Sequence, residues 1–202
     1  MANQVSILPN PKFTHCTVAH RFVTLPALVA NARLFEIACL TAAKIVVLTR
    51  LRIEVVQTAV HTAALLDFFE AFRVSGFTAV DTTNTATPVA VPKQTGEGQA
   101  LTPAVIRGMT AAGHANGMTG GTLSKATFTS PFLSRGMWML AAVPTTPNTN
   151  VMVAEYNPML SGSAPMVFKF QEGFIVENGV LLGAAAASAV SIEADFGIGD
   201  GS

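Results

Sequence analysis

The chain has 202 residues, and its 12 Lys and Arg side chains balance its 12 Asp and Glu side chains, so the formal net charge is zero. Charged residues make up only 12% of the sequence, against about 25% in typical soluble domains. This balance argues against nucleic acid as a partner, because binding it needs a basic surface, and against an anionic membrane. A hydrophobic fraction of 50% excludes a disordered chain. So neutral a surface keeps a free monomer poorly soluble, which indicates that partner chains cover part of it.

Targeting segments and covalent cross-links are not predicted. The N-terminus lacks the basic region and long apolar core of a secretory signal. Charged residues such as Arg33, Glu36 and Lys44 interrupt the most apolar stretch, so no window offers the roughly 20 apolar residues of a spanning helix. Cys16 and Cys39 could pair, but two cysteines make no disulfide framework, and we favour two buried free thiols.

Residues 1–30 are predicted to form an extended N-terminal arm. Prolines such as Pro9 and Pro11 punctuate this segment, and the residue before a proline is pushed towards an extended conformation. Such an arm either adds to a sheet or reaches a neighbouring subunit. Residues 81–125 have little regular pattern and are predicted to form a long interacting loop. We expect arm and loop to bury against neighbouring chains, so that deleting residues 1–24 leaves the domain folded but weakens assembly.

The clearest strand signal covers residues 44–56. Alternate positions there are mainly apolar and β-branched, whereas the positions between them include three charged side chains. The set predicted to face the core is Ile45, Val47, Thr49, Leu51, Ile53 and Val55. A shorter strand is predicted at residues 34–40. Residues 68–77 contain helix formers as well, but their alternation favours a strand.

Further short strands are predicted at residues 136–142, 151–156, 166–170, 174–176 and 190–196, with turn residues between them. In the last strand, Val190, Ile192, Ala194 and Phe196 are predicted to face the core, and Ser191, Glu193 and Asp195 to face outward. Many short strands with regular turn signals predict an all-β fold. We therefore expect one antiparallel β-sandwich domain over residues 31–202, with the jelly roll as its most specific form.

Two stretches are similar to known binding motifs. His15, Cys16 and His20 are potential zinc ligands, but a site needs three or four converging groups, and residues 15 and 20 of a strand point to opposite faces. The glycine-rich residues 113–125 are superficially similar to a phosphate loop, which needs Gly-Lys followed by Ser or Thr at a helix start. Here Lys125 instead follows a serine and precedes a strand-like pattern. We expect neither a metal nor a nucleotide site.

Catalytic pairs are not predicted. The acidic residues are scattered, and Glu193 and Asp195 lie on the polar face of the last strand, as a solvated face requires. His61 and His114 have no local partner pattern. We therefore expect no catalytic, cofactor-binding or metal-binding residues and no enzyme activity.

Phenylalanine dominates the aromatic residues, with 13 Phe against one Trp and one Tyr. Sugar-binding surfaces favour Tyr and Trp, whose rings carry a polar group, so this composition disfavours a lectin. Trp138, between Met137 and Met139, is predicted to be a core residue or an interface anchor. The predicted core phenylalanines are Phe68, Phe69, Phe72, Phe77, Phe168, Phe170, Phe174 and Phe196.

The order of the sequence elements carries a resemblance. The elements are Leu34-Phe35-Glu36-Ile37, the strand at 44–56, the segment 69–78, Arg107-Gly-Met-Thr with its glycine-rich loop, Gln171-Glu-Gly-Phe-Ile-Val176 and the closing strand near Phe196. In this order, over about residues 22–198, the chain resembles a loose family of small β-rich structural proteins of tailed bacteriophage virions.

This resemblance implies a function without catalysis. Proteins of this kind are similar to capsid decoration, or cement, proteins, which bind and stabilise the phage head shell. The expected partners are the major capsid protein or another virion protein and further copies of the chain, with a trimer as the first homo-oligomer to test; the expected location is the virion. The alternative is a tail or fibre component that acts as a receptor- or carbohydrate-binding module.

Overall fold

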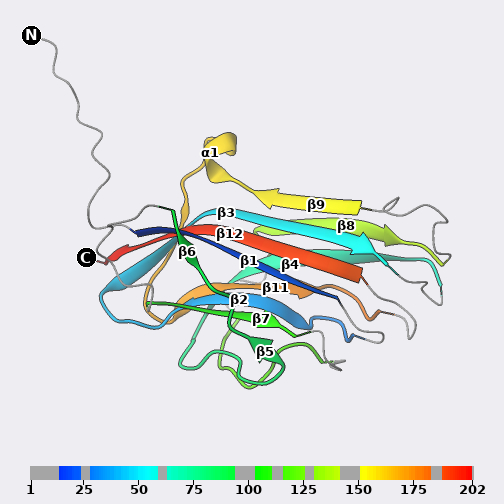
Figure 1. Cartoon of the computed structure of the whole chain (residues 1–202), viewed down its shortest axis with the longest axis horizontal. Coiled ribbons are helices and arrows are strands. Elements are labelled where there is room, and N and C mark those ends of the chain that lie inside the picture. Colours follow the sequence, from blue (N-terminus) through cyan, green and yellow to red (C-terminus); the bar gives the residue numbers. More distant parts are fainter. Residues whose placement is uncertain are drawn as a thin grey trace, which may run out of the picture.

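The computed structural model describes residues 14–23, 28–58, 63–93, 103–110, 116–125, 130–141, 151–182 and 188–201. These residues form two six-stranded antiparallel sheets that pack face to face (Figure 1). The fold is therefore an all-β sandwich, as the sequence predicts, and the jelly roll stays a prediction. The described helix, α1, is a single turn, Pro158–Ser161.

Sheet A has the strand order β10 (Met166–Phe168), β3 (Lys44–Gln57), β12 (Ser188–Asp200), β1 (Thr14–Val23) and β6 (Val91–Pro92), and β9 (Val151–Tyr156) pairs with the other half of the β3 edge. Sheet B has the order β5 (Thr85–Ala86), β7 (Ala104–Met109), β2 (Arg33–Cys39), β11 (Glu172–Asn178), β4 (Leu65–Ser75) and β8 (Leu133–Met139). β8 and β9 contact each other along one side of the sandwich (Figure 1). The strand predicted in preference to a helix at 68–77 is confirmed by β4.

A β-bulge corrects the predicted inward face of β3. Asp195 of β12 pairs with Arg50, whereas Phe196 pairs with Leu48, so Thr49 is an extra residue on β3. One extra residue reverses the alternation of side chains. Leu51, Ile53 and Val55 face the core as predicted, but beyond the bulge the buried residues are Val46 and Leu48 instead of Ile45, Val47 and Thr49.

Within the predicted arm, residues 14–23 form a strand of sheet A. β1 pairs with β12 over its whole length, from Thr14 opposite Ile198 to Val23 opposite Ala189. Its inward side chains include Cys16, Val18 and Phe22, which are buried in the main core. The segment therefore adds to the sheet of its own chain, whereas we expected the arm to bury against a neighbouring chain; residues 1–13 and 24–27 lie outside the described residues.

The region predicted as a long loop, 81–125, differs from that expectation over its described residues. It contributes β5, β6 and β7, and residues 116–125 form isolated bridges to sheet B and to the segment at Thr83. Residues 77–80 and 121–124 cover part of the outer face of sheet B. The apolar residues below this cover form a second core: Ala38, Phe72, Val74, Phe77, Val80 and Ile175. Much of this region thus folds onto its own domain.

Most of the predicted core is confirmed. Six of the eight phenylalanines named as core residues are buried: Phe69, Phe72, Phe77, Phe168, Phe174 and Phe196. The other two, Phe68 and Phe170, are exposed by more than a third because they lie on outer surfaces. The free-thiol prediction is also confirmed, since Cys16 and Cys39 are both buried and do not form a disulfide with each other.

Polar side chains join the two sheets at both sides. The Gln57 side chain at the end of β3 donates to the carbonyl oxygen of Leu140 at 2.7 Å and accepts from the Leu140 N–H at 2.8 Å. On the other side, Nε2 of His20 in β1 lies 2.8 Å from the carbonyl oxygen of Met109 in β7. The His20 ring packs so closely on Gly108 that an added Cβ there would lie 2.3 Å from it.

Candidate functional site

The predicted cluster of zinc-like ligands is spread over β1. Cys16 is buried in the core and His15 is exposed on the opposite face. His20 points between the sheets, where burial lowers its pKa. Among the described residues, no three His, Cys, Asp or Glu side chains come together as a metal site. His61 and His114 lie outside the described residues.

The described part of the glycine-rich stretch, residues 116–125, is a structural cover. Met118 forms a bridge with Arg33, and the Gly121 N–H donates to Oδ1 of Asp81 at 2.8 Å. Lys125, the residue compared with a phosphate-binding lysine, forms an ion pair with the buried Glu177. The stretch therefore donates to carboxylates of its own chain.

A pair of buried acidic side chains lies beneath this cover. Glu36 in β2 and Asp81 are both fully buried. Oε1 of Glu36 accepts a 2.7 Å hydrogen bond from the N–H of Asp81, while Oε2 has no hydrogen-bond partner in the described part of the chain. Nη1 of Arg33 lies 3.1 Å from Oδ2 of Asp81. Asp81 is thus paired with a cation, whereas Glu36 is held by a backbone N–H.

Burial and the neighbouring Asp81 charge raise the pKa of Glu36 to about 7, against the attraction of Arg33 and Arg107. Two carboxylates this close resist simultaneous ionisation. Near neutral pH the Glu36 carboxyl group can therefore change its protonation state within the fold. Sequence analysis missed this group, although an acidic residue at the centre of the apolar run 34–40 was a visible signal.

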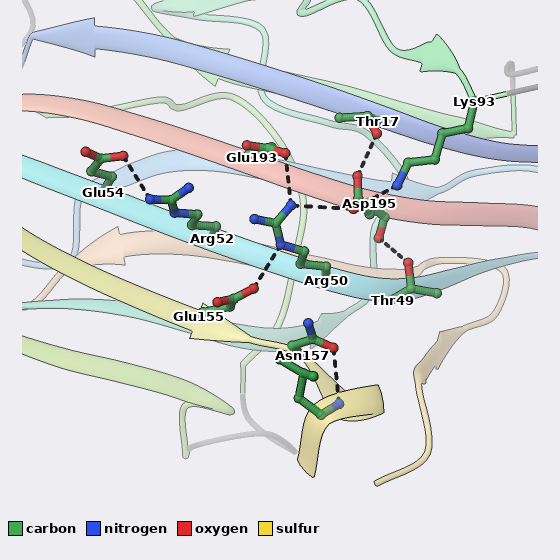
Figure 2. Close-up of polar contacts among 11 residues, drawn as sticks. Thr17, Thr49, Arg50, Arg52, Glu54, Lys93, Glu155, Asn157, Glu193 and Asp195 are labelled. Atoms are coloured by element: carbon green, nitrogen blue, oxygen red, sulfur yellow. Dashed lines mark hydrogen bonds and ion pairs between the residues drawn. The ribbon is translucent and has the colours of Figure 1, made fainter. Parts of the chain in front are cut away.

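The outer face of sheet A carries a network of charges (Figure 2). Nε of Arg50 donates to Glu155 on β9 at 2.9 Å, and Nη1 donates to Glu193 on β12 at 3.1 Å. The hydrogen bond to Glu155 is the main cause that raises the pKa of Arg50. Exposed pairs of this kind are worth about 0–1 kcal/mol each, so the network fixes side-chain positions more than it stabilises the fold.

Asp195 is the most enclosed member of this network. Its carboxylate accepts from the Thr17 hydroxyl at 2.6 Å and pairs with Lys93 at 2.9 Å (Figure 2). Burial alone would raise the pKa of Asp195, but Thr17, Lys93 and Arg50 together outweigh it and lower the pKa. Glu193 and Asp195 lie on the outward face as predicted, although Asp195 is only 9% exposed.

An exposed apolar patch lies on the outer face of sheet B, at the β4–β8 end. Leu66 pairs directly with Trp138 across the two strands, and Phe68 pairs with Gly136. A Cβ at Gly136 would lie 3.2 Å from both Leu66 and Phe68, so these two side chains meet over the glycine. Trp138 is 55% exposed, while Met137 and Met139 beside it are buried. The core alternative for Trp138 is therefore wrong, and its role as an interface anchor stays a prediction.

The fold and these surfaces define an all-β sandwich with exposed charged and apolar faces. Comparisons of the chain with models of protein families, with curated proteins and with solved structures found no match. Within the described ranges, no helix has the length and apolar character needed to cross a membrane.

Proposed function

We propose that this chain is a structural protein of a bacteriophage virion that binds and stabilises the head shell and has no catalytic activity of its own. The observation that carries the binding role is the apolar patch of Leu66, Phe68 and Trp138 on two paired strands. Side chains on paired strands are held in place before binding, which lowers the ordering cost of an interface. The virion as location rests on the sequence resemblance.

Trp138 is the expected centre of this contact. Tryptophan is enriched among the residues that dominate interface energies, and exposed apolar patches mark interaction sites. The charge-poor composition fits the same role. A surface with few charges keeps a protein less soluble, and a partner that covers the patch removes its apolar side chains from water.

Binding of purified protein to purified head shells tests this proposal. We expect Trp138→Ala to weaken binding by about 10-fold or more. Leu160→Ala is the matched control, because Leu160 is a large apolar residue on α1 that is 81% exposed. Equal binding by the two variants would show that the patch is not part of the contact with the head shell.

The copy number per particle separates the two virion roles. A decoration protein should be present in numbers comparable with the shell subunits. The alternative, a tail or fibre component that binds a receptor or carbohydrate, should be present in far fewer copies. Absence of the chain from purified particles would overturn both.

A further inference from the structure

The outer face of sheet A has an ordered pattern across four strands, β1, β12, β3 and β9. Because the strands pair in register, residues directly opposite one another form cross-strand rows on one face. The row nearest the Val23 end is entirely apolar: Val23, Ala189, Val56 and Val151. Val23 is 43% exposed and Val151 is 46% exposed. Burial of this apolar row against another surface would be favourable, because it removes apolar area from water.

The next row places opposite charges on either side of β12. It contains Arg21, Ser191, Glu54 and Val153. Arg21 is exposed, and Glu54 lies 3.5 Å from Arg52 in an ion pair at the surface (Figure 2). An open groove of about 530 Å³ lies over these two rows. The central strand contributes only the small side chains of Ala189 and Ser191, which lets another surface approach closely.

We propose that a second copy of this chain docks on this face, with a two-fold axis that runs along β12 near Ser191. Such an axis carries β1 of one copy over β3 of the other at the same level. Arg21 then faces Glu54 of the partner subunit, and Glu54 faces Arg21 of the partner subunit. Val23 likewise faces Val56 of the partner subunit. One rotation therefore matches both the charged row and the apolar row.

The size and geometry of the face suit this contact. Strands spaced about 4.8 Å apart and rows spaced about 6.6 Å apart give roughly 475 Å² for the three strands that overlap across this axis, β1, β12 and β3, over the five outward positions of β1. Two copies together then bury about 950 Å², close to the approximately 1,000 Å² that a specific interface needs. Sheets that pack face to face align within about 30°, and the rows close to Ser191 keep their partners under such a tilt.

The charges further along the face are satisfied within each copy. The third row is Ala19, Glu193, Arg52 and Glu155. Glu193 lies on β12, along the axis, and would face Glu193 of the partner subunit. Within each copy, however, Nη1 of Arg50 lies 3.1 Å from the Glu193 carboxylate and offsets its charge. The matched contacts between the copies therefore come from the first two rows, and the other rows add covered surface.

This dimer concerns a different face from the patch at Trp138 and does not depend on the proposed virion role. Purified full-length protein, without particles, provides the test, with mass measured by light scattering or sedimentation. The wild-type chain should be dimeric. Arg21→Glu and Glu54→Arg should each raise the dissociation constant by about 10-fold or more, because each places like charges opposite each other twice.

Mixing the two variants makes the test specific. Arg21→Glu presents two acidic groups and Glu54→Arg presents two basic groups, so equal amounts of the two should form a heterodimer. The double variant Arg21→Glu/Glu54→Arg should also recover the homodimer. Arg135→Glu, a charge reversal at an exposed position of β8 in sheet B, is the matched control and should leave the dimer unchanged.

Circular dichroism verifies that each variant is folded before mixing. A monomeric wild-type protein at high concentration would overturn the proposal. So would an assembly that Arg21→Glu leaves intact, or variants that associate no better together than alone. Because shells are absent from these measurements, their failure leaves the head-shell proposal to its own test.

Discussion

Oε1 of Glu36 accepts a 2.7 Å hydrogen bond from the backbone N–H of Asp81, and this contact joins a central strand of sheet B to the segment that covers its outer face. The Asp81 carboxylate in turn accepts from the Gly121 N–H at 2.8 Å. Two fully buried acidic residues therefore hold two separate pieces of the cover. Glu36 therefore links the cover to the sheet through a carboxyl group whose pKa burial raises.

We expect the contribution of Glu36 to the free energy of unfolding to fall as the pH rises from about 4.5 to about 7. The pKa of Glu36 rises from 4.5 to about 7 in the folded state, so the folded protein binds its proton more tightly than the unfolded chain does. That stabilisation is complete below the unfolded pKa and is lost as the pH passes the folded one. Burial raises the pKa of Asp67 to about 6, which acts in the same direction.

Glu36→Gln isolates the contribution of Glu36. The amide oxygen can accept from Asp81 as the carboxylate does, but the side chain cannot ionise. Relative to wild type, the variant should gain up to about 3 kcal/mol between pH 5 and pH 8, measured by urea unfolding at both values. The contribution of Asp67 is common to both proteins and cancels. A constant difference between the two proteins would contradict this role for Glu36.

Phe196 and Glu193 provide a comparison of the two faces of β12. Phe196 is 1% exposed in the main core, so Phe196→Ala should destabilise the protein by about 3–5 kcal/mol. Glu193 lies on the outer face, and Glu193→Ala should change stability by about 0.5 kcal/mol at most. Chemical denaturation measures both. Similar losses from the two substitutions would contradict the orientation of this strand.

Gly108→Ala should destabilise the protein because its Cβ would lie 2.3 Å from the His20 ring. The ring would have to move and give up its 2.8 Å contact with the Met109 carbonyl, at a cost of about 2 kcal/mol. In a His20→Ala background, the same glycine substitution should cost much less. This double-mutant cycle measures directly the interaction energy between the two residues. Strictly additive losses would show that the cost of Gly108→Ala does not come from the His20 ring.

The sequence pattern predicts the strands well because alternation is a local signal. β9 matches its predicted range, and the inward residues of β12 are as expected. The bulge at Thr49 could not be predicted, since it depends on which residue of β12 lies opposite. Glu36 illustrates the same limit: its residue type was visible, but its partner Asp81 is 45 positions away and comes close only in the fold.

Phe68 and Phe170 show where hydrophobicity alone misleads. Both were predicted to be core residues, and both are exposed by more than a third. Phe68 lies on the face of β4 opposite to the buried Phe69. A sheet with apolar residues on both faces gives no alternation from which the solvent side can be read. In such a strand only the packing of other segments decides which aromatic residue is covered.

Two N-terminal deletions test whether residues 14–23 belong to the fold. β1 pairs along all of its length with β12 and contributes Cys16, Val18 and Phe22 to the core. Deletion of residues 1–24 removes this strand and leaves an edge of β12 unpaired. We expect that variant to lose cooperative thermal unfolding or to aggregate, contrary to the expectation for a separate arm.

Deletion of residues 1–12 is the matched control, because it leaves every residue of β1 in place. This shorter deletion should retain a cooperative transition in a thermal scan followed by circular dichroism. If the protein without residues 1–24 instead melts cooperatively at the wild-type temperature, β1 contributes little to stability. The pairing of β1 with β12 would then be an addition to a sandwich that the remaining strands complete by themselves.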